Sequence, residues 1–325
     1  MTTLVTGATG LVGSAVVSEL IDRGESVRIL RREKSAMDLL GELADKVDHR
    51  IGDVTDRVSV DEAMQGVDVL YHVAARLGFG GKKETRDMMR VNVDGTRNVV
   101  DAALHAGVKR MVHTSSIAAL GRADWSEGVM DENSEWQDSP ANTVYGVSKH
   151  KAELEVFRGI AEGLDAVMVN PSMIFGVGRP GENTRQLVDQ VRRRQLPAAP
   201  TGGNGVVDVL DVAGGHLRAM DEGGTGERYI LSGENLSWRT IIDMIAEGFG
   251  VRPPRLQLSL PLGMVLATVM EASGRLFRFR PLITREAVTQ ASRTFEYSNK
   301  KAVDELACTF RPFQETIERI VRAIG

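Results

Sequence analysis

Cysteine is almost absent from the 325-residue sequence, which contains only Cys308. A single thiol can form neither an internal disulfide nor a multi-cysteine zinc site, and such low usage is typical of a reducing compartment. An excess of basic charge is missing too, because 40 Lys and Arg residues stand against 44 Asp and Glu, a formal net charge of −4. No global positive field would draw the chain onto nucleic acid or an anionic bilayer. We therefore expect no nucleic-acid partner.

Long hydrophobic runs are lacking as well. No stretch reaches the roughly 18 consecutive apolar residues that a spanning helix needs, and the longest candidate, residues 260–270, ends at Glu271. The N-terminus, MTTLVTGATG, has no basic segment followed by an apolar run, as a secretory signal would, and instead begins in an apparent strand. We therefore expect a cytoplasmic protein.

The apolar run leaves three interpretations open. It is followed by SGRLFRFRPL, so residues 256–280 could make a peripheral contact with a membrane surface through apolar and basic side chains. A helix that covers an apolar ligand pocket, or one that forms a dimer contact, is the interpretation that we favour.

Apolar residues make up 42 percent and charged residues 26 percent of the chain, which fits one large globular domain or two fused smaller ones. The first half alternates short β-branched runs with longer helical patterns, the signature of a parallel sheet buried on both faces. The predicted strands are 3–6, 26–30, 47–51, 67–73, 109–115 and 166–170, and the predicted helices are 11–23, 35–44, 58–65, 87–106 and 145–162.

These patterns predict an α/β fold, a Rossmann-type doubly wound parallel sheet with a smaller interleaved α+β C-terminal region for substrate. Residues 1–171 would form the dinucleotide-binding domain and 172–325 mainly the substrate region, where the pattern loosens and loops lengthen. A short strand at about 227–231 would return to the main sheet.

A glycine-rich turn follows the first predicted strand directly. The residues Gly7, Gly10 and Gly13 are spaced G-x-x-G-x-x-G and open a helix. In a dinucleotide site the first glycine permits the tight turn, the second lets the backbone approach a pyrophosphate, and the third allows close helix–strand packing. The helix N-terminus supplies unpaired N–H groups for the anion. We expect Thr9, Leu11 and Val12 to contact the cofactor with the three glycines.

The end of the second strand favours NADP over NAD. An NAD site normally places a carboxylate there for the ribose 2′-hydroxyl, whereas this chain has Arg31 and Arg32. A planar guanidinium would pair with a 2′-phosphate. The next residue, Glu33, could turn its carboxylate toward the ribose 2′-hydroxyl, so NAD remains the less favoured alternative.

Two further strand ends are candidates for cofactor contacts. Asp53, followed by Val54, closes the third strand, where a carboxylate could accept a hydrogen bond from the adenine amino group. The fourth strand ends in Ala74 and Ala75, small residues that would let a ligand lie against the backbone. His72, just before them, is expected to pack or cap and not to catalyse.

Tyr145 and Lys149 are four residues apart and therefore share one face of a helix. A phenol is a poor acid–base catalyst at neutral pH, but a neighbouring ammonium and the positive charge of a bound nicotinamide both favour the phenolate. Thr114, Ser115 and Ser116, at the end of the fifth strand, offer hydroxyls that could hydrogen-bond a substrate carbonyl.

The motifs TGATGLVG, GDV, HVAA, VNVDGT, HTSSIAALG, YGVSK and VNPSMIFGVG, in this order, resemble the extended short-chain dehydrogenase/reductases, which include the NAD-dependent epimerases and dehydratases. The amino-acid sequence in and around these motifs is similar to that of the dihydroflavonol reductase-like branch, which includes bacterial hopanoid-associated sugar epimerase-like members. The resemblance spans essentially the whole chain.

The resemblance implies that Tyr145 is the acid–base and that Lys149 holds the ribose and lowers the pKa of the phenol. Ser116 matches the catalytic Ser/Thr better than Ser115, which would sit in the strand. Pro171 and Ser172 match the stretch that contacts the nicotinamide amide.

Three other positions also have counterparts in the family. Asn92 matches a structural asparagine that joins helix and strand. Asp208 and Asp211 match a substrate-side loop usually written V-H-V-D-D-V-A, but the missing histidine and the altered spacing of the acids put that role in doubt.

We therefore expect an NADP(H)-dependent oxidoreductase that transfers a hydride to a ketone or aldehyde. The alternative is a nucleotide-sugar epimerase or dehydratase, for whose diphosphate seven arginines are available: Arg179, Arg185, Arg192, Arg193, Arg194, Arg252 and Arg255. A minor alternative is a non-catalytic NADPH sensor. The partner would be a small molecule, without a metal ion. The resemblance implies that helices 87–106 and 145–162 could form a homodimer contact, although their faces could equally serve a monomer.

Overall fold

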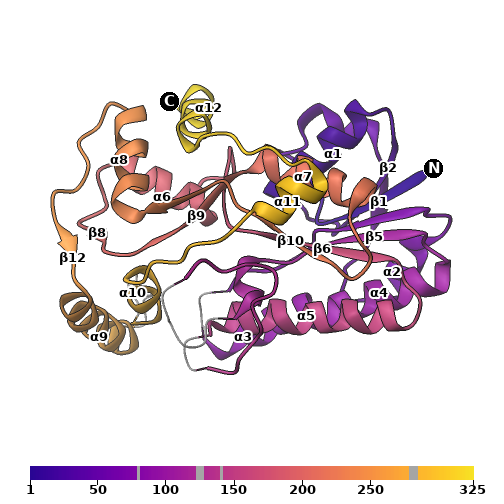
Figure 1. Ribbon diagram of the computed structural model, residues 1–325, viewed down its shortest axis with the longest axis horizontal. Coiled ribbons are helices and arrows are strands. Elements are labelled where there is room, and N and C mark those ends of the chain that lie inside the picture. The colour runs from indigo at the N-terminus through magenta and orange to yellow at the C-terminus, as the bar shows by residue number, and fades with distance from the viewer. Residues whose placement is uncertain (79–80, 122–127, 140–141, 278–284) are drawn as a thin grey trace.

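A seven-stranded parallel sheet forms the centre of the computed structural model, which describes residues 1–78, 81–121, 128–139, 142–277 and 285–325 (Figure 1). Its strand order is β10-β6-β5-β4-β1-β2-β3. The strands are β1 (Thr2–Thr6), β2 (Ser26–Arg31), β3 (Asp48–Ile51), β4 (Val69–His72), β5 (Arg110–Thr114), β6 (Ala166–Pro171) and β10 (Arg228–Leu231). The six strands predicted in the first half are confirmed, and β10 pairs with β6 in parallel register.

Successive side chains of each strand point to opposite faces of the sheet and therefore pack against different layers of helices. Val5, Tyr71 and Val112 point to one face, where they pack against α1 (Leu11–Asp22), α7 (Val209–Glu222) and α11 (Lys300–Leu306). Their neighbours Leu4, Leu70 and Met111 point to the other face, which is covered by α2 (Arg57–Met64), α4 (Gly95–Ala106) and α5 (Val144–Ala161). Both faces are thus apolar, as a doubly wound sheet requires.

The prediction of a helix over residues 35–44 was wrong. The segment forms turns and then a short 3-10 helix, η1 (Gly41–Lys46), with Gly41 at a positive φ of 51°. The main-chain carbonyl of Ala36 is bonded to the side chain of Arg179 and not to a following turn. A tertiary hydrogen bond has therefore replaced the helical one.

The predicted helix 87–106 is built from three pieces. These are α3 (Lys82–Met89), a π-helical turn η2 (Arg90–Asp94) and α4. Asn92 lies in the π-helical turn, which directs its side chain away from the helix and into the fold. Such local widening is common at functional sites.

The chain after β6 adds two small sheets beside the main one. The first has the order β11-β9-β7 and the second pairs β12 with β8. Their strands are β7 (Met173–Phe175), β8 (Ala199–Pro200), β9 (Gly203–Asp208), β11 (Glu234–Ser237) and β12 (Gln257–Leu258), and the remaining helices are η3 (Ile117–Leu120), α6 (Asn183–Arg192), α8 (Trp238–Gly248), α9 (Leu260–Phe277), α10 (Arg285–Ala291) and α12 (Phe313–Ile324). Figure 1 shows most of this region at one end of the molecule, beyond the main sheet.

No helix among the described residues is both long enough and apolar enough to cross a membrane. The segment predicted as a pocket cover, dimer contact or membrane contact corresponds to β12 and α9, and its residues 278–280 lie outside the described part of the chain.

Candidate functional site

The glycine turn lies at the carboxyl end of β1 and needs glycine for steric reasons. Gly7 has a φ of 72°, and a Cβ there would lie 2.6 Å from the main-chain nitrogen of Ala74. A Cβ on Gly13 would lie 2.1 Å from the carbonyl oxygen of Gly7. Gly10 is different, since only that same carbonyl stands near its Cβ position, at 3.4 Å. A side chain at Gly7 or Gly13 would therefore clash with the protein's own main chain, whereas the space beside Gly10 is free.

The open side of the turn fits a pyrophosphate. Gly10 is the N-cap of α1 and supplies no side-chain cap, so the first N–H groups of the helix remain available to an anion. Leu11 and Val12 are the first residues of the helix, and Thr9 precedes it. A dinucleotide lying across this end of β1 would use the arrangement that the sequence predicted.

Arg179 holds the glycine turn from a distant part of the chain, a contact that sequence reasoning missed. Its guanidinium donates to the carbonyl of Thr9 at 2.9 Å and to the carbonyl of Ala36 at 3.0 Å, and it pairs with Asp38. Arg179 therefore joins the loop after β7 to both loops expected to bind cofactor phosphates. No local pattern could have shown this, because the partners are more than 140 positions apart.

The two arginines after β2 have different surroundings. Arg31 is partly buried and its Nε donates to Nδ1 of His49 at 2.9 Å. Arg32 is exposed, as are Glu33 and Lys34 beside it. Arg32 is therefore the residue of the pair that is more accessible to a ligand.

Asp53 and Val54 follow β3. Oδ1 of Asp53 accepts hydrogen bonds from the main chain and hydroxyl of Thr55 at 2.9 and 2.8 Å, so one carboxylate oxygen stabilises the turn. Val54 is buried, and its carbonyl accepts a hydrogen bond from Asn98.

The chain after β4 passes directly beside the glycine turn. The main-chain N–H of Ala74 donates to the hydroxyl of Thr6 at 3.3 Å, and Ala75 is exposed. Asn92 fixes the next stretch, since Oδ1 accepts from the N–H of Arg76 at 2.7 Å and Nδ2 donates to its carbonyl at 3.0 Å. The predicted structural role of Asn92 is confirmed.

Tyr145, Lys149 and Ser116 meet where β5 ends and α5 begins. Tyr145 is in the first turn of α5, which Thr143 caps, and Lys149 is one turn further. Nζ of Lys149 is buried and donates to the carbonyl of Thr114 at 2.6 Å. Ser116 follows β5 as the N-cap of η3, where its hydroxyl accepts a hydrogen bond from the main-chain N–H of Ala118 at 3.2 Å, and it lies near enough to the phenol of Tyr145 to lower the pKa of that group. The three predicted side chains are thus brought together.

Burial shapes the proton affinities at this site. It raises the pKa of Tyr145 to about 12, and the hydrogen bond with Ser116 opposes this shift. Burial lowers the pKa of Lys149 to about 8, while the carboxylate of Glu153 acts to raise it. The phenol is therefore the proton-bearing form at neutral pH.

A buried polar network behind these residues was not predicted. Asn170 of β6 donates to the carbonyl of Ser116 at 3.1 Å and to Oε1 of Glu153 at 2.7 Å. Glu153 lies one turn after Lys149 and its Oε2 is 3.6 Å from Arg228. The spacing of Lys149 and Glu153 could have suggested that they share a helix face, whereas the link to Asn170 needs the fold.

Three histidines, His72, His113 and His216, are fully buried in the sheet and the helix beside it. His72 bonds the hydroxyls of Thr6 at 2.7 Å and Thr96 at 3.0 Å. His216 bonds the hydroxyl of Thr114 and the carbonyl of Val212, both at 2.7 Å. Burial lowers the pKa of His72 to about 3 and that of His216 to about 4. The expectation that His72 packs and does not catalyse agrees with these contacts.

Pro171 ends β6 and Ser172 follows it, both buried at the carboxyl edge of the sheet. The hydroxyls of Ser115, Ser172 and Ser232, which follow the neighbouring strands β5, β6 and β10, are buried and have no hydrogen-bond partner within the described residues. A row of unsatisfied hydroxyls at this edge is suited to polar atoms of a ligand or to water.

Asp208 and Asp211 do not lie in a loop. Asp208 ends β9, caps α7 and pairs with Arg319 at 2.8 Å. Asp211 is in the first turn of α7 and pairs with Arg311 at 2.7 Å. Both carboxylates therefore anchor the C-terminal segment, which corrects the substrate-loop interpretation.

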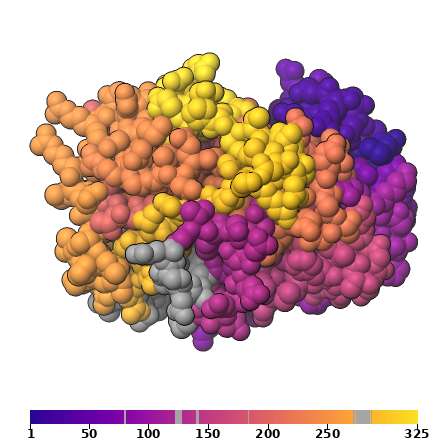
Figure 2. Space-filling view, viewed as in Figure 1, coloured from indigo at the N-terminus to yellow at the C-terminus, as the bar shows by residue number. Residues whose placement is uncertain are grey.

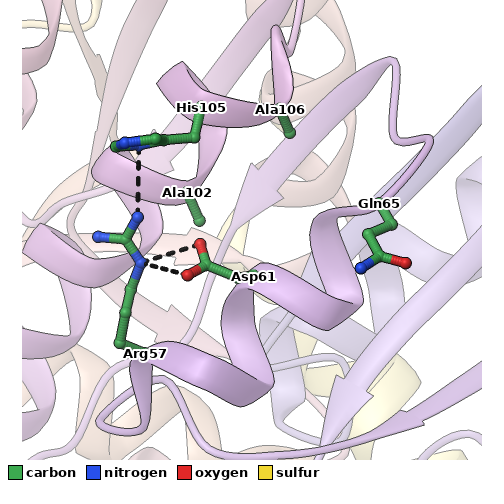
Figure 3. A pocket seen from close by; sticks show the side chains of 6 residues that line it. All are labelled: Arg57, Asp61, Gln65, Ala102, His105 and Ala106. Atoms are coloured by element: carbon green, nitrogen blue, oxygen red, sulfur yellow. Dashed lines mark hydrogen bonds and ion pairs between the residues drawn. The ribbon is translucent and has the colours of Figure 1, made fainter.

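The pocket in Figure 3 lies between α2 and α4, and none of the predicted site residues lines it. Its arginine, Arg57, is paired with Asp61 at 2.8 Å and Asp101 at 3.0 Å. We therefore assign the pocket no part in the site.

Comparison with known proteins agrees with this geometry. The model of the NAD dependent epimerase/dehydratase family matches residues 3–232. A Synechocystis protein provisionally named dihydroflavonol 4-reductase is 35% identical over 93% of this chain and 88% of its own length. Sterol demethylase protein B of Methylococcus capsulatus is 38% identical over 85% of this chain and 83% of its own length. The crystal structure of gox2253 superposes with a TM-score of 0.85 at 36% identity, covering 99% of this chain and 97% of that one.

Three findings lead to the same family assignment. The family match covers more than half of the chain, relatives exceed 30% identity, and the Rossmann-like sheet has the glycine turn at its first strand. The chain therefore belongs to the NAD dependent epimerase/dehydratase family of extended short-chain dehydrogenases/reductases, whose members are NAD(P)-dependent reductases, epimerases and dehydratases.

Proposed function

We propose that this protein is an NADP(H)-dependent carbonyl reductase, which can also run in reverse as an alcohol dehydrogenase, and that its substrate is a largely apolar ketone or aldehyde. Residues 1–171 would bind the cofactor and 172–325 mainly the substrate.

The chain's own residues can hold the cofactor. Gly7, Thr9, Gly10, Leu11, Val12 and Gly13 would cradle the pyrophosphate, Asp53 and Val54 the adenine, and Ala74, Ala75, Pro171 and Ser172 the nicotinamide half. Arg32, exposed after β2, would pair with the 2′-phosphate, with Arg31 held beside it by His49. When bound, the reduced nicotinamide would supply the hydride.

The proton transfer to the substrate would depend on Ser116, Tyr145 and Lys149. In carbonyl reduction the phenol of Tyr145 gives its proton to the carbonyl oxygen as that oxygen gains negative charge, and is then reprotonated from solvent. The hydroxyl of Ser116, which lies near the phenol and acts to lower its pKa, would orient the same oxygen. The ammonium of Lys149 would favour the transient phenolate and hold the ribose.

Three of the seven arginines that could serve a sugar diphosphate are already bound within the protein, which favours a reductase over a nucleotide-sugar enzyme. A sugar diphosphate needs uncommitted basic groups. Arg179 is bound to Thr9 and Asp38, Arg185 pairs with Asp189 at 3.0 Å, and Arg192 donates to the carbonyl of Ile324. The other four arginines lie after α6 or before β12, in exposed segments.

The side of the site next to Ser116 is apolar. Ile117, Leu120, Ile230, Phe295 and Tyr297 form a buried cluster there. Two relatives are named for dihydroflavonol reduction and sterol demethylation. A sterol is a polycyclic, mainly hydrocarbon molecule, which supports an apolar substrate, and a dihydroflavonol is an aromatic ketone, which supports a carbonyl substrate.

The proposal is tested by measuring the consumption of NADPH and of NADH with a panel of aromatic, steroidal and long-chain ketones. Epimerisation of UDP- and dTDP-sugars is measured in parallel. We expect turnover of apolar ketones with NADPH. Turnover of the nucleotide sugars alone would establish the epimerase alternative, and NADPH binding without any turnover would support the sensor.

We also propose a homodimer through α4 and α5. Leu154 and Phe157 are exposed on α5, and Leu154 lines a shallow pocket with Met89 and Val93. Sedimentation of the wild type and of Leu154→Asp tests this contact.

A further inference from the structure

Helix α9 is packed with its small residues inward and its large apolar residues outward. Ala267 is fully buried, and a Cβ on Gly263, one turn earlier, would lie 2.7 Å from Cγ1 of Val288 in α10. The outer face carries Leu262, Val265, Leu266 and Val269, which are 53%, 61%, 41% and 59% exposed. This outer face is named the α9 stripe below.

The α9 stripe has the i, i+3, i+4, i+7 spacing of a helix face that is normally buried. Leu260 and Leu256, 42% and 69% exposed, extend it toward the preceding loop. Six of the large apolar side chains exposed on the described residues thus lie within fourteen consecutive positions. Clustering of this kind marks an interaction surface, whereas scattered exposed leucines do not.

The charges next to the stripe select its partner. Residues 248–270 contain Arg252 and Arg255 and no aspartate or glutamate, and the next acidic residue is Glu271, later in α9. Both arginines are exposed, and their loop is fixed by a hydrogen bond from Arg239 to the carbonyl of Pro254 at 2.8 Å. A second copy docking through the stripe would bring these arginines together without a carboxylate from this segment, whereas anionic lipid headgroups would pair with them.

The segment that follows α10, the helix packed against α9, leads to the apolar cluster beside Ser116. The chain leaving α10 is tied to β9 by hydrogen bonds between Gly203 and Arg293 at 3.0 Å and between Phe295 and Gly203 at 3.1 Å. Phe295 belongs to the apolar cluster beside Ser116. Figure 1 shows α9 at the outer end of the molecule with α10 between it and the sheets.

We propose that the α9 stripe docks on an anionic phospholipid bilayer, lying in the interface with Arg252 and Arg255 among the headgroups. The lipophilic substrate would then enter from the membrane, a consequence that rests on the proposed function. The docking itself does not depend on turnover.

The docking is tested by flotation of the full chain with lipid vesicles. The vesicles consist of phosphatidylcholine with about 30 percent of the anionic lipid phosphatidylglycerol. We expect Val265→Asp to lower vesicle binding at least about tenfold. The matched control is Val58→Asp on α2, since Val58 is 65% exposed and lies outside the stripe. The double variant Arg252→Gln/Arg255→Gln should remove the preference for phosphatidylglycerol over pure phosphatidylcholine and most of the salt sensitivity.

NADPH titration and thermal melting confirm that each variant is folded, and turnover of a water-soluble ketone should be the same for Val265→Asp and the wild type. Equal vesicle binding by Val265→Asp and Val58→Asp would overturn the proposal. So would a wild type that ignores vesicles but sediments as a dimer that Val265→Asp dissociates. Failure of all ketone assays with intact vesicle binding would instead count against the reductase alone.

Discussion

Arg179 donates a hydrogen bond to the main-chain carbonyl of Thr9 at 2.9 Å, although 170 positions separate them in the sequence. Through the same guanidinium the loop after β7 is bound to Asp38. The C-terminal region thereby holds the glycine turn and the loop after β2 in a fixed relation. Cofactor binding should therefore depend on a residue outside the nucleotide-binding fingerprint.

Replacement of Arg179 by alanine should weaken NADPH binding by about tenfold, because the glycine turn and the loop at residues 36–38 lose their common donor. Fluorescence titration measures the Kd. Arg193→Ala, an exposed arginine after α6, is the matched control and should bind NADPH normally. An unchanged Kd for Arg179→Ala would show that the turn is rigid without it.

Replacement of Arg32 by glutamate should reverse the cofactor preference, since a carboxylate repels the 2′-phosphate and accepts hydrogen bonds from a 2′-hydroxyl. The ratio of kcat/KM for NADPH to that for NADH should fall by at least about tenfold. The same ratio is measured for Lys34→Glu, also exposed in this loop. If both variants shift the ratio equally, the effect is the net charge of the loop and not a contact of Arg32.

Loss of the phenol hydroxyl in Tyr145→Phe should lower kcat by about 10²- to 10⁴-fold with little change in NADPH binding, because only proton transfer is removed. The neighbouring serines provide a matched pair: Ser116 lies near the phenol and acts to lower its pKa, whereas the hydroxyl of Ser115 has no partner within the described residues. Ser116→Ala should therefore reduce kcat more than Ser115→Ala does. Equal losses would remove Ser116 from its proposed role.

Neutralising Glu153 should shift the alkaline limb of the pH–rate profile. The carboxylate acts to raise the pKa of Lys149, which burial lowers to about 8. In Glu153→Gln that pKa should fall further, so the ammonium is lost, and the phenolate loses its stabilisation, at a lower pH than in the wild type. Glu162→Gln, at the exposed end of α5, should keep the wild-type profile. A purely structural Glu153 would change the rate at all pH values alike.

The fold should lose stability in mild acid. The folded-state pKa values of His72 and His216, about 3 and about 4, lie below the 6.5 of an unfolded histidine. As pH falls from 6.5 toward 4 the unfolded chain therefore takes up protons that the folded chain does not, and each such histidine removes roughly 1.4 kcal/mol of unfolding free energy per pH unit.

Urea denaturation between pH 6.5 and 4.5 measures this slope. His216→Gln should reduce the slope by one histidine's share, whereas His105→Gln, at the exposed C-terminal end of α4, should leave it as in the wild type. Identical slopes for the wild type and His216→Gln would mean that His216 is protonated in the folded protein.

Local patterns were sufficient for much of the fold and the site. The strands, the glycine turn, and the pairing of Tyr145 with Lys149 follow from spacings within a few residues, which backbone geometry translates directly into position. The predicted helix at 35–44 failed because the carbonyl of Ala36 is taken by Arg179. Asn170 and Glu153 were missed for a similar reason, since their hydrogen bonds join elements that only the sheet order brings together.

The position of β10 has a consequence for biosynthesis. It is the last strand of the main sheet and closes the edge formed by β6, which ended more than fifty residues earlier in the chain. While the ribosome translates the intervening segment, the backbone of β6 stays unpaired on that side. Six of the seven strands have then been synthesised, and the sheet keeps one open edge, at which unfolded chains can pair, until Leu231 has left the ribosome.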